Sequence, residues 1–319
     1  LRTSILYPHT PVLPPKPYDT MYDPEQMVFP TDGKEYRGTT DFERIALRQF
    51  ATLEGMKPEE IRKMRAHYYG LCSYVDSEIG RFVNYLKENW TRPYIIVFHA
   101  DHGNLIGEHN LREKFSMHEG ATRVPLIISG CGIPKGKRIK KLVELVDLAP
   151  TLLNYVNLEI TAEMGFQGEN LLPLMENESM PWHDAAFSEY RPMGLNDLEM
   201  FPPLKQFVMT EINGVQGFEF DRLKEIAEAE GLDLRKLEDL PEGVPYRYWR
   251  PIFKCIHTER YVLAVKAVWL EGQGNDWMGS LYDLQEDPHE LCNVFNDPSY
   301  EGIRETLVNR LKSWDMDTN

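Results

Sequence analysis

The chain has 319 residues, and 42% of them are hydrophobic, which is enough to bury a large core. It contains no apolar run of the length that spans a bilayer, so we expect no membrane segment. Its formal net charge of −15 disfavours binding to nucleic acid and to anionic lipid. An anionic substrate would therefore need local positive charge, from a metal ion or from Lys, Arg and His.

The N-terminal part of the chain combines an apolar run, a proline-rich segment and a long periodic segment. Residues 3–7 are apolar and rich in β-forming residues, which predicts a strand. The prolines from Pro8 to Pro17 predict an extended loop after it. From Pro58, apolar residues recur three and four positions apart, and this pattern predicts an amphipathic helix that ends near Asn89.

Two continuous apolar runs follow, at residues 94–98 and 124–129. Each is typical of a strand that is buried on both faces, as in a parallel sheet. Asp147 is expected to N-cap a helix that continues to Val156. Helices and strands in alternation favour an α/β layer fold.

After about residue 180 the pattern changes to short strand candidates and charged helical segments. The strand candidates are 187–190, 207–209, 253–256 and 261–265, and the helix candidates are 221–240 and 300–314. The sequence thus predicts an α/β domain at 1–180 and a smaller α+β subdomain with an antiparallel sheet at 181–319.

The four cysteines form neither a CxxC motif nor a Cys/His zinc spacing. They are Cys72, Cys131, Cys255 and Cys292. We expect them to be buried or partly buried thiols.

The strongest candidate for chemistry is Asp101-His102-Gly103, directly after the strand predicted at 94–98. Ligand sites of open α/β sheets lie at the carboxyl ends of strands. Asp supplies an oxygen ligand and His a nitrogen ligand for a metal, and Gly103 permits the turn that would bring both to one ion. For the tripeptide alone, a capped turn beside a hydrogen-bonded His is the stronger reading.

The surrounding sequence favours the metal site over the capped turn. Residues 95–129 read IIVFHADHGNLIGEHNLREKFSMHEGATRVPLIIS. This run closely resembles the sulfatase family pattern, in which a buried strand ends in S/A-D-H/N-G. In the family pattern G-D/E-H, a Lys and an R-x-P-L-I strand follow, here as Gly107-Glu108-His109, Lys114 and Arg123-Val124-Pro125-Leu126-Ile127.

Further segments extend the resemblance over nearly the whole chain, most weakly at 195–250. Pro8-His9-Thr10-Pro11 resembles the family's H-x-P segment, and residues 74–81 resemble its Y-x-D-x-x-I-G-R helix. Residues 146–152 resemble its D-L-A-P-T-L segment. Residues 257–261 and 281–290 resemble its R-T-x-R-Y strand and its L-Y-D-L-x-x-D-P-x-E closing motif.

The resemblance implies an alkaline-phosphatase-like fold with a mixed, mostly parallel sheet flanked by helices. It makes Asp101 and His102 two of four metal ligands, with Ca²⁺ the expected ion and Mn²⁺ or Mg²⁺ as alternatives. Lys114 would contact the sulfate, and His9 would bind an ester oxygen or protonate the leaving group. A solvated Lys114 and a His9 that only braces its loop are the competing interpretations. Arg123 and His118 are expected to be structural.

The chain departs from the family pattern in its nucleophile. The family uses a formylglycine made from Cys or Ser in C/S-x-P-S/A-R, and no such motif occurs here, since Cys131-Gly132-Ile133-Pro134 has its proline one position late. The family's Asp-Asp metal pair is also absent. We expect the chain to be the C-terminal portion of a longer enzyme. A non-catalytic binding relative and a nucleophile supplied by a partner are the alternatives.

The function that the resemblance implies is hydrolysis of a small-molecule or carbohydrate sulfate ester. A phosphonate monoester or phosphodiester hydrolase is the alternative enzyme, and a sulfatase-like binding protein is the alternative class. Expected partners are the ester and an N-terminal fragment of the same enzyme, with a homo-oligomer left open. The cellular location is left open as well.

Overall fold

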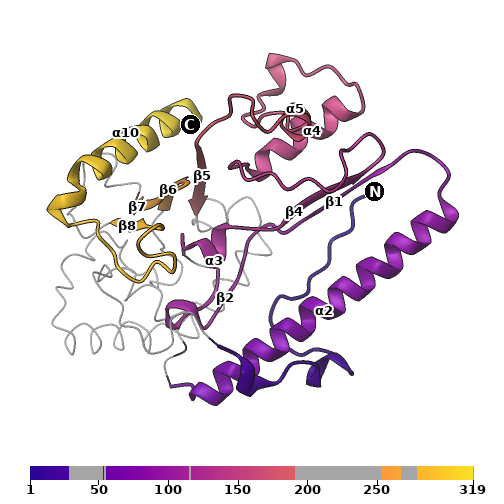
Figure 1. Ribbon diagram of the computed structural model, residues 1–319, viewed down its shortest axis with the longest axis horizontal. Coiled ribbons are helices and arrows are strands. Elements are labelled where there is room, and N and C mark those ends of the chain that lie inside the picture. Colours follow the sequence, from indigo (N-terminus) through magenta and orange to yellow (C-terminus); the bar gives the residue numbers. More distant parts are fainter. Residues whose placement is uncertain (29–52, 54, 115, 191–252, 267–278, 319) are drawn as a thin grey trace, which may run out of the picture. The chain divides into compact units, whose positions relative to one another are not determined.

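The computed structural model describes residues 1–28, 53, 55–114, 116–190, 253–266 and 279–318 (Figure 1). These residues form two compact units. The first contains the described residues up to Lys114 together with residues 119–138. The second contains residues 116–118 and the described residues from Ile139 onward. The division into domains at residue 180 stays a prediction.

The N-terminal segment of the first unit forms no strand at residues 3–7, so that expectation was wrong. Leu1 and Leu6 are largely exposed, and a β-rich run becomes a strand only where a neighbouring strand completes its hydrogen bonds. Two 3-10 turns follow the proline-rich segment, η1 (Tyr18–Thr20) and η2 (Pro24–Gln26).

The predicted long helix is confirmed as α2 (Pro58–Asn89). Proline occupies its first position, and the Glu60 carboxylate accepts a hydrogen bond from the Lys57 backbone N–H at 2.8 Å. The N-terminal segment packs on this helix through Tyr74, whose ring lies 5.9 Å from that of Tyr7 and 5.5 Å from that of Tyr18. Helix α2 therefore anchors the loop that carries His9.

The two apolar runs of the first unit are strands β1 (Ile95–His99) and β4 (Leu126–Gly130). They pair antiparallel, with Val97 opposite Ile128, and both are only partly buried. The expectation of a parallel strand buried on both faces is thus not met by this pair. The segment between β1 and β4 contains only the short β2–β3 hairpin and the one-turn helix α3, and the chain enters β4 running opposite to β1.

A short hairpin lies between these strands in the sequence. It pairs β2 (Leu105–Ile106) with β3 (Arg112–Glu113) through the turn η3 (Glu108–Asn110), and α3 (Glu119–Thr122) follows it. Leu105 lies opposite Glu113, and both residues of β2 are buried.

The second unit begins with small helices. They are η4 (Leu145–Asp147), α4 (Leu148–Tyr155), η5 (Ala162–Met164) and α5 (Leu172–Glu176). Asp147 stands at the N-cap position of α4 as predicted, but its side chain does not cap that helix. It accepts instead from the backbone N–H groups of Glu144 and Glu169, each at 2.8 Å. Its buried carboxylate thus joins two loops.

A four-stranded antiparallel sheet forms the rest of the second unit, with strand order β5-β6-β7-β8 (Figure 1). The strands are β5 (Ala185–Tyr190), β6 (Phe253–Thr258), β7 (Tyr261–Lys266) and β8 (Gly279–Asp283). Three of them and the antiparallel sheet were predicted; β8 was missed as a strand. Tyr190 and Phe253 are direct partners across the first ladder. The candidates at 207–209 and 221–240 lie outside the described residues.

Helix α10 (Glu301–Thr318) covers one face of this sheet, close to its predicted position. Its Leu307, Val308 and Leu311 pack with Ile256 and Leu263 in the core of the unit. Next along β6 and β7, Cys255 and Val262 belong to a separate buried cluster with Met117. The alternation of the two clusters along each strand follows from the two-residue repeat of a strand.

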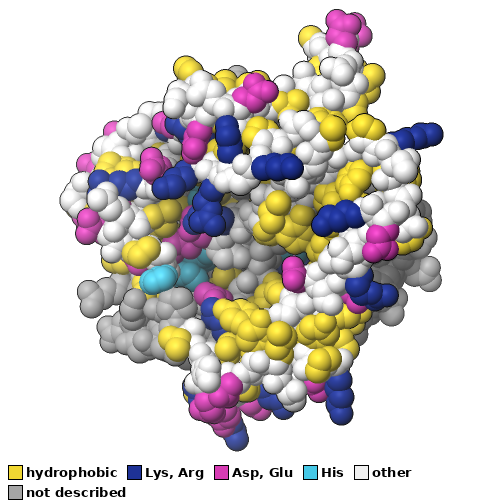
Figure 2. Space-filling view, turned by 45° about the vertical axis from the view of Figure 1, so that its right-hand side comes forward, with side chains coloured by type: hydrophobic (Ala, Val, Ile, Leu, Met, Phe, Trp, Pro, Cys, Tyr) yellow, Lys and Arg dark blue, Asp and Glu magenta, His cyan; other side chains and the backbone are white. Residues whose placement is uncertain are grey.

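The cysteines and the surface differ in part from expectation. Cys255 is buried and Cys292 partly buried, as predicted, whereas Cys72 and Cys131 are exposed, and none of the four forms a disulfide. Figure 2 shows hydrophobic side chains interspersed with charged ones on one face of the molecule. Among the described helices, none is both long and apolar enough to cross a bilayer.

Candidate active site

Asp101 and His102 form an exposed turn just after β1. The Asp101 carboxylate accepts a hydrogen bond from the His102 backbone N–H at 3.1 Å, and its side chain is 87% exposed. His102 Nδ1 lies 2.8 Å from the carbonyl oxygen of Gly103, which only accepts hydrogen bonds, so the ring proton sits on Nδ1. Nε2 then has a free lone pair, and it lies 3.8 Å from the nearer Asp101 oxygen.

Gly103 is needed in this turn because another backbone comes close, and not because of a positive φ. Its N–H donates to the Ala121 carbonyl at 2.7 Å, and a Cβ at this position would overlap the carbonyl oxygen of Gly120. The turn that bears Asp101 is thus held against α3 by contacts that only glycine allows.

His9 and Lys114 lie in direct contact. His9 Nδ1 lies 2.8 Å from the Thr10 carbonyl oxygen, so Nδ1 carries the proton and donates it to that carbonyl. The Lys114 ammonium donates to Nε2 of His9 at 2.9 Å. The Lys114 side chain is 22% exposed, which contradicts the interpretation of it as a freely solvated lysine.

The β2–β3 hairpin lies between the Asp101–His102 turn and Lys114 in the sequence. Leu105 lies opposite Glu113 in the antiparallel register. Asn104, which follows the Asp101 turn, therefore continues one strand at the end of the hairpin where Lys114 continues the other. The hairpin brings the chain segments of both pairs to one end of its ladder.

Helix α2 contacts this hairpin through its side chains. Arg65 pairs with Glu108 at 2.8 Å, and the Glu108 carboxylate also accepts from the Ile106 backbone N–H at 2.7 Å. Burial raises the pKa of Tyr68 to about 12, with nearby Cys72 adding to the shift and a hydrogen bond with Asn104 opposing it. Tyr68 therefore keeps its phenolic proton at neutral pH beside the Asp101 turn.

Sequence reasoning missed two contributors to the His9–Lys114 pair. The Thr10 hydroxyl donates to Glu113 at 3.3 Å, and the other Glu113 oxygen lies 3.7 Å from the Lys114 ammonium. Glu113 stood in the sequence as one charge in the run Arg112-Glu113-Lys114. The pattern carries no signal that it would face Thr10, a hundred residues away.

Arg123 and His118, both expected to be structural, differ in burial. Arg123 forms an ion pair with Glu119 one helical turn away, at 3.4 Å, and its side chain is 77% exposed. This contact is local and does not support a bracing role. His118, in the second unit, is buried beside Tyr282, with ring centroids 5.7 Å apart, in accord with a packing role.

The donor set at Asp101 and His102 fits part of a divalent metal site. A carboxylate oxygen and an imidazole lone pair face each other at a separation that one ion can bridge. Across the described parts of the chain, no group of three or more His, Cys, Asp or Glu side chains comes together as a metal site. This turn thus offers two protein ligands.

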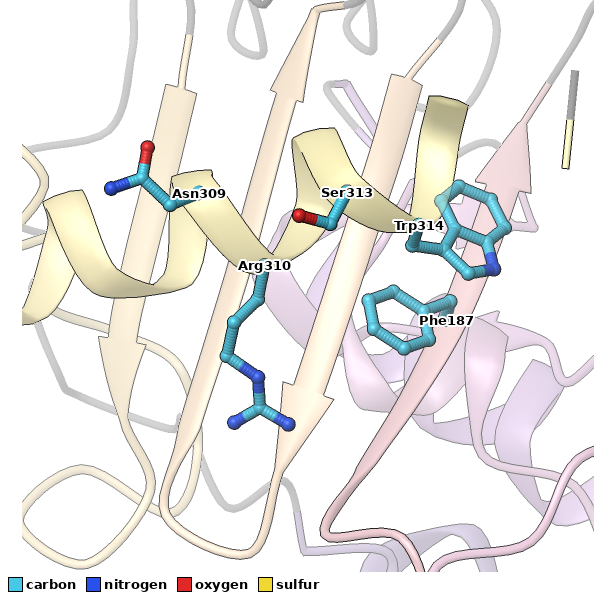
Figure 3. A pocket seen from close by; sticks show the side chains of 5 residues that line it. All are labelled: Phe187, Asn309, Arg310, Ser313 and Trp314. Atoms are coloured by element: carbon cyan, nitrogen blue, oxygen red, sulfur yellow. The ribbon is translucent and has the colours of Figure 1, made fainter. Parts of the chain in front are cut away.

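The second unit contains a hollow that involves none of these residues (Figure 3). It is lined by Phe187, Asn309, Arg310, Ser313 and Trp314. The rings of Phe187 and Trp314 stack at 5.1 Å, and Arg310 pairs with Asp184 at 2.5 Å. These contacts account for the arrangement of its aromatic and charged side chains, and we do not place the chemistry there.

Residues 4–158 match the family model named Sulfatase, and this range contains the Asp101 turn, His9 and Lys114. This part of the chain belongs to the sulfatase family. The match confirms the resemblance that the motifs carry. The sulfatase family is part of the alkaline phosphatase superfamily.

Curated relatives carry arylsulfatase names. The chain is 32% identical over 196 residues to the arylsulfatase of Clostridium perfringens, covering 60% of this chain and 40% of that protein. It is 36% identical over 143 residues to arylsulfatase K of Danio rerio, covering 43% of this chain and 27% of that protein. The chain thus spans less than half the length of these sulfatase relatives.

Solved structures confirm the alkaline-phosphatase-like α/β fold. The phosphonate monoester hydrolase of Silicibacter pomeroyi superposes with a TM-score of 0.69 at 24% identity, covering 98% of this chain and 55% of that one. The phosphonate monoester hydrolase of Agrobacterium radiobacter gives 0.68 at 23% identity, with 99% and 56% covered. At this identity the likeness concerns the fold.

Proposed function

We propose that this sulfatase-family chain takes part in the hydrolysis of sulfate esters. The observation that carries the proposal is the contact of the Lys114 ammonium with His9 Nε2 at 2.9 Å. The chain has a net charge of −15, so an anionic ester needs a local cation where it reacts. Lys114 supplies that charge next to a group able to exchange protons, and the arylsulfatase names of the relatives support the choice of ester.

In this proposal Asp101 and His102 hold a divalent ion, with Ca²⁺ expected and Mn²⁺ or Mg²⁺ as alternatives. When bound, the ion withdraws charge from the sulfuryl oxygens and orients them. The tautomer of His102 suits the role, because Nδ1–H is held by the Gly103 carbonyl and Nε2 keeps its lone pair. The carboxylate of Asp101 supplies a hard oxygen ligand with compensating charge.

His9 and Lys114 are proposed to act on the ester itself. The ammonium can donate to a sulfuryl oxygen, and a charge-assisted hydrogen bond of this kind is stronger than one between neutral groups. His9 holds its Nε2 toward the Lys114 proton, so a proton shared between the two atoms is available to the leaving oxygen. We assign no nucleophile to this chain.

The substrate of the proposal is a small-molecule or carbohydrate sulfate ester, and hydrolysis of a phosphonate monoester or phosphodiester is the competing reaction. The test uses the protein expressed from its complete gene. Rates are measured side by side on an aryl sulfate, an aryl phosphonate monoester and a phosphodiester. We expect the sulfate to be hydrolysed fastest, with the rate abolished by a chelator.

Two variants make this assay specific to the proposed site. Lys114→Met should reduce the sulfatase rate by at least about a hundredfold, since it removes a charged group that contacts the reacting ester. Lys63→Met, which removes an exposed lysine on α2, should leave the rate unchanged. A faster phosphonate or diester rate, or a sulfatase rate that survives Lys114→Met, would contradict the proposal.

A further inference from the structure

We infer that Glu113 is a positioning residue that holds the Lys114 ammonium against His9. The inference deepens the proposed function, on which it rests for its catalytic meaning. Its carboxylate contacts both chain segments of the pair: one oxygen accepts from the Thr10 hydroxyl at 3.3 Å, and the other lies 3.7 Å from Lys114 Nζ.

These contacts close a ring of four residues. His9 Nδ1–H donates to the carbonyl of Thr10, whose hydroxyl donates to Glu113. Glu113 pairs with the Lys114 ammonium, which returns to His9 Nε2. Two short segments far apart in the sequence thus fix each other, and Glu113 is the member that touches the cation and the opposite segment at once.

The surroundings make the Glu113 contacts more effective than those of a surface ion pair. Its side chain is 15% exposed and that of Lys114 is 22% exposed. Solvent therefore screens the attraction less than it would on an open surface. A carboxylate held in this way further restricts the ammonium at the end of its flexible four-carbon chain.

The backbone of Glu113 gives independent support. Its φ is +72°, in the left-handed region that glycine adopts without cost and that a residue with a Cβ does not favour. Strained conformations of this kind persist where the surrounding structure fixes them, and they gather at functional sites. Glycine would suit this backbone better, so the presence of glutamate indicates that its carboxylate has a role.

The experiment follows the His9–Lys114 hydrogen bond directly. The ¹⁵N resonance of His9 Nε2 is recorded at about pH 8, where an ordinary imidazole is neutral. Lys114→Met gives the resonance position without the ammonium donor, and the unchanged chain gives the position with it. Glu113→Gln keeps an oxygen for Thr10 but removes the attraction for the ammonium. We expect it to move the resonance more than half of the way to the Lys114→Met position.

Two further variants test whether the shift of the His9 resonance comes from the position of Lys114, and not from the loss of any carboxylate or from a loss of protein stability. Glu119→Gln removes a carboxylate from the exposed Arg123 pair and should leave the resonance in place. Glu113→Gly should move the resonance as Glu113→Gln does, without lowering the thermal midpoint, because glycine relieves the positive φ. The inference is overturned if the His9 resonance of Glu113→Gln moves less than half of the interval. It is also overturned if the His9 resonance of Glu113→Gly moves less than half of the interval while the thermal midpoint of that variant falls.

This readout is independent of hydrolysis. A shifted resonance in a protein that does not hydrolyse sulfate esters supports the role of Glu113 in placing Lys114 and refutes only the proposed activity. An active sulfatase in which neither Glu113 variant moves the resonance refutes only the positioning role.

Discussion

The Lys114 ammonium lies 2.9 Å from His9 Nε2, although 105 residues separate the two in the chain. The imidazole is turned toward the ammonium because its other nitrogen is engaged by the Thr10 carbonyl. The contact orients one ammonium in an acidic chain, with Glu113 as its counter-ion at 3.7 Å. An oxyanion entering this site would find a donor that is already oriented.

Replacing Lys114 by Met should therefore weaken the binding of inorganic sulfate. Loss of one charge-assisted hydrogen bond costs about 1.5–3 kcal/mol, which is roughly 10–100-fold in Kd. Isothermal titration of sulfate into the metal-loaded protein measures this change. Lys63→Met serves as the control because it removes the same charge from an exposed position on α2. Equal affinities in the two variants would argue against an anion site at Lys114.

The Asp101–His102 turn predicts a second binding change. Asp101→Asn keeps the size of the side chain but removes the charge of one of the two donors that face each other. We expect affinity for Ca²⁺ or Mn²⁺ to fall roughly tenfold or more, because hard cations depend on carboxylate charge. Equilibrium dialysis of the metal gives the affinity. Asp76→Asn, at an exposed position on α2, should bind metal as the unchanged chain does.

Gly103→Ala should destabilise the protein, because the new methyl group would overlap the Gly120 carbonyl oxygen, which is backbone and cannot turn aside. Overpacking of this kind costs about 1–3 kcal/mol. Gly80→Ala is the matched control, since a Cβ at that helical position meets nothing within 4 Å. It should stabilise α2 by up to about 1 kcal/mol. Urea unfolding of both variants checks the opposite signs.

The second unit predicts a specific acid sensitivity. Hydrogen bonds from Arg260, at 2.9 and 2.7 Å, hold the pKa of the Asp283 carboxyl below its usual range. A depressed folded-state pKa contributes stability above the ordinary aspartate value of about 3.9, and this contribution is lost as the pH falls through the folded value. Asp283→Asn should lower the thermal midpoint at neutral pH and reduce its fall in acid.

Thermal midpoints recorded from about pH 7 down to about pH 2 test this dependence. Glu305→Gln, an exposed substitution on α10, should follow the curve of the unchanged chain. A parallel acid dependence of Asp283→Asn and the unchanged chain would contradict the assigned sign.

The sequence could predict those elements whose pattern is local. Helix α2 followed from apolar spacing with its start at Pro58 and its end at Asn89. The strand predicted at 3–7 failed because β propensity without a neighbouring strand does not form a ladder. The antiparallel pairing of β1 with β4 is a property of where the chain returns, which the two apolar runs do not encode.

The candidate site could also be predicted only in part. Resemblance selected Lys114 and His9, but only the folded chain shows that they touch and that Thr10 and Glu113 complete their contacts. The left-handed backbone of Glu113 could not be anticipated, because glutamate gives no signal for a positive φ. Long-range contacts and special backbone angles are the two kinds of information that local patterns lack.

The pairing of Tyr190 with Phe253 has a consequence for how the protein can vary. The two described residues that flank positions 191–252 thus lie side by side on adjacent strands. Closing a longer connection costs little, about 0.6 kcal/mol for each doubling of a flexible loop. Insertions, deletions or an exchanged module between these positions should therefore leave the β5–β6 ladder in register.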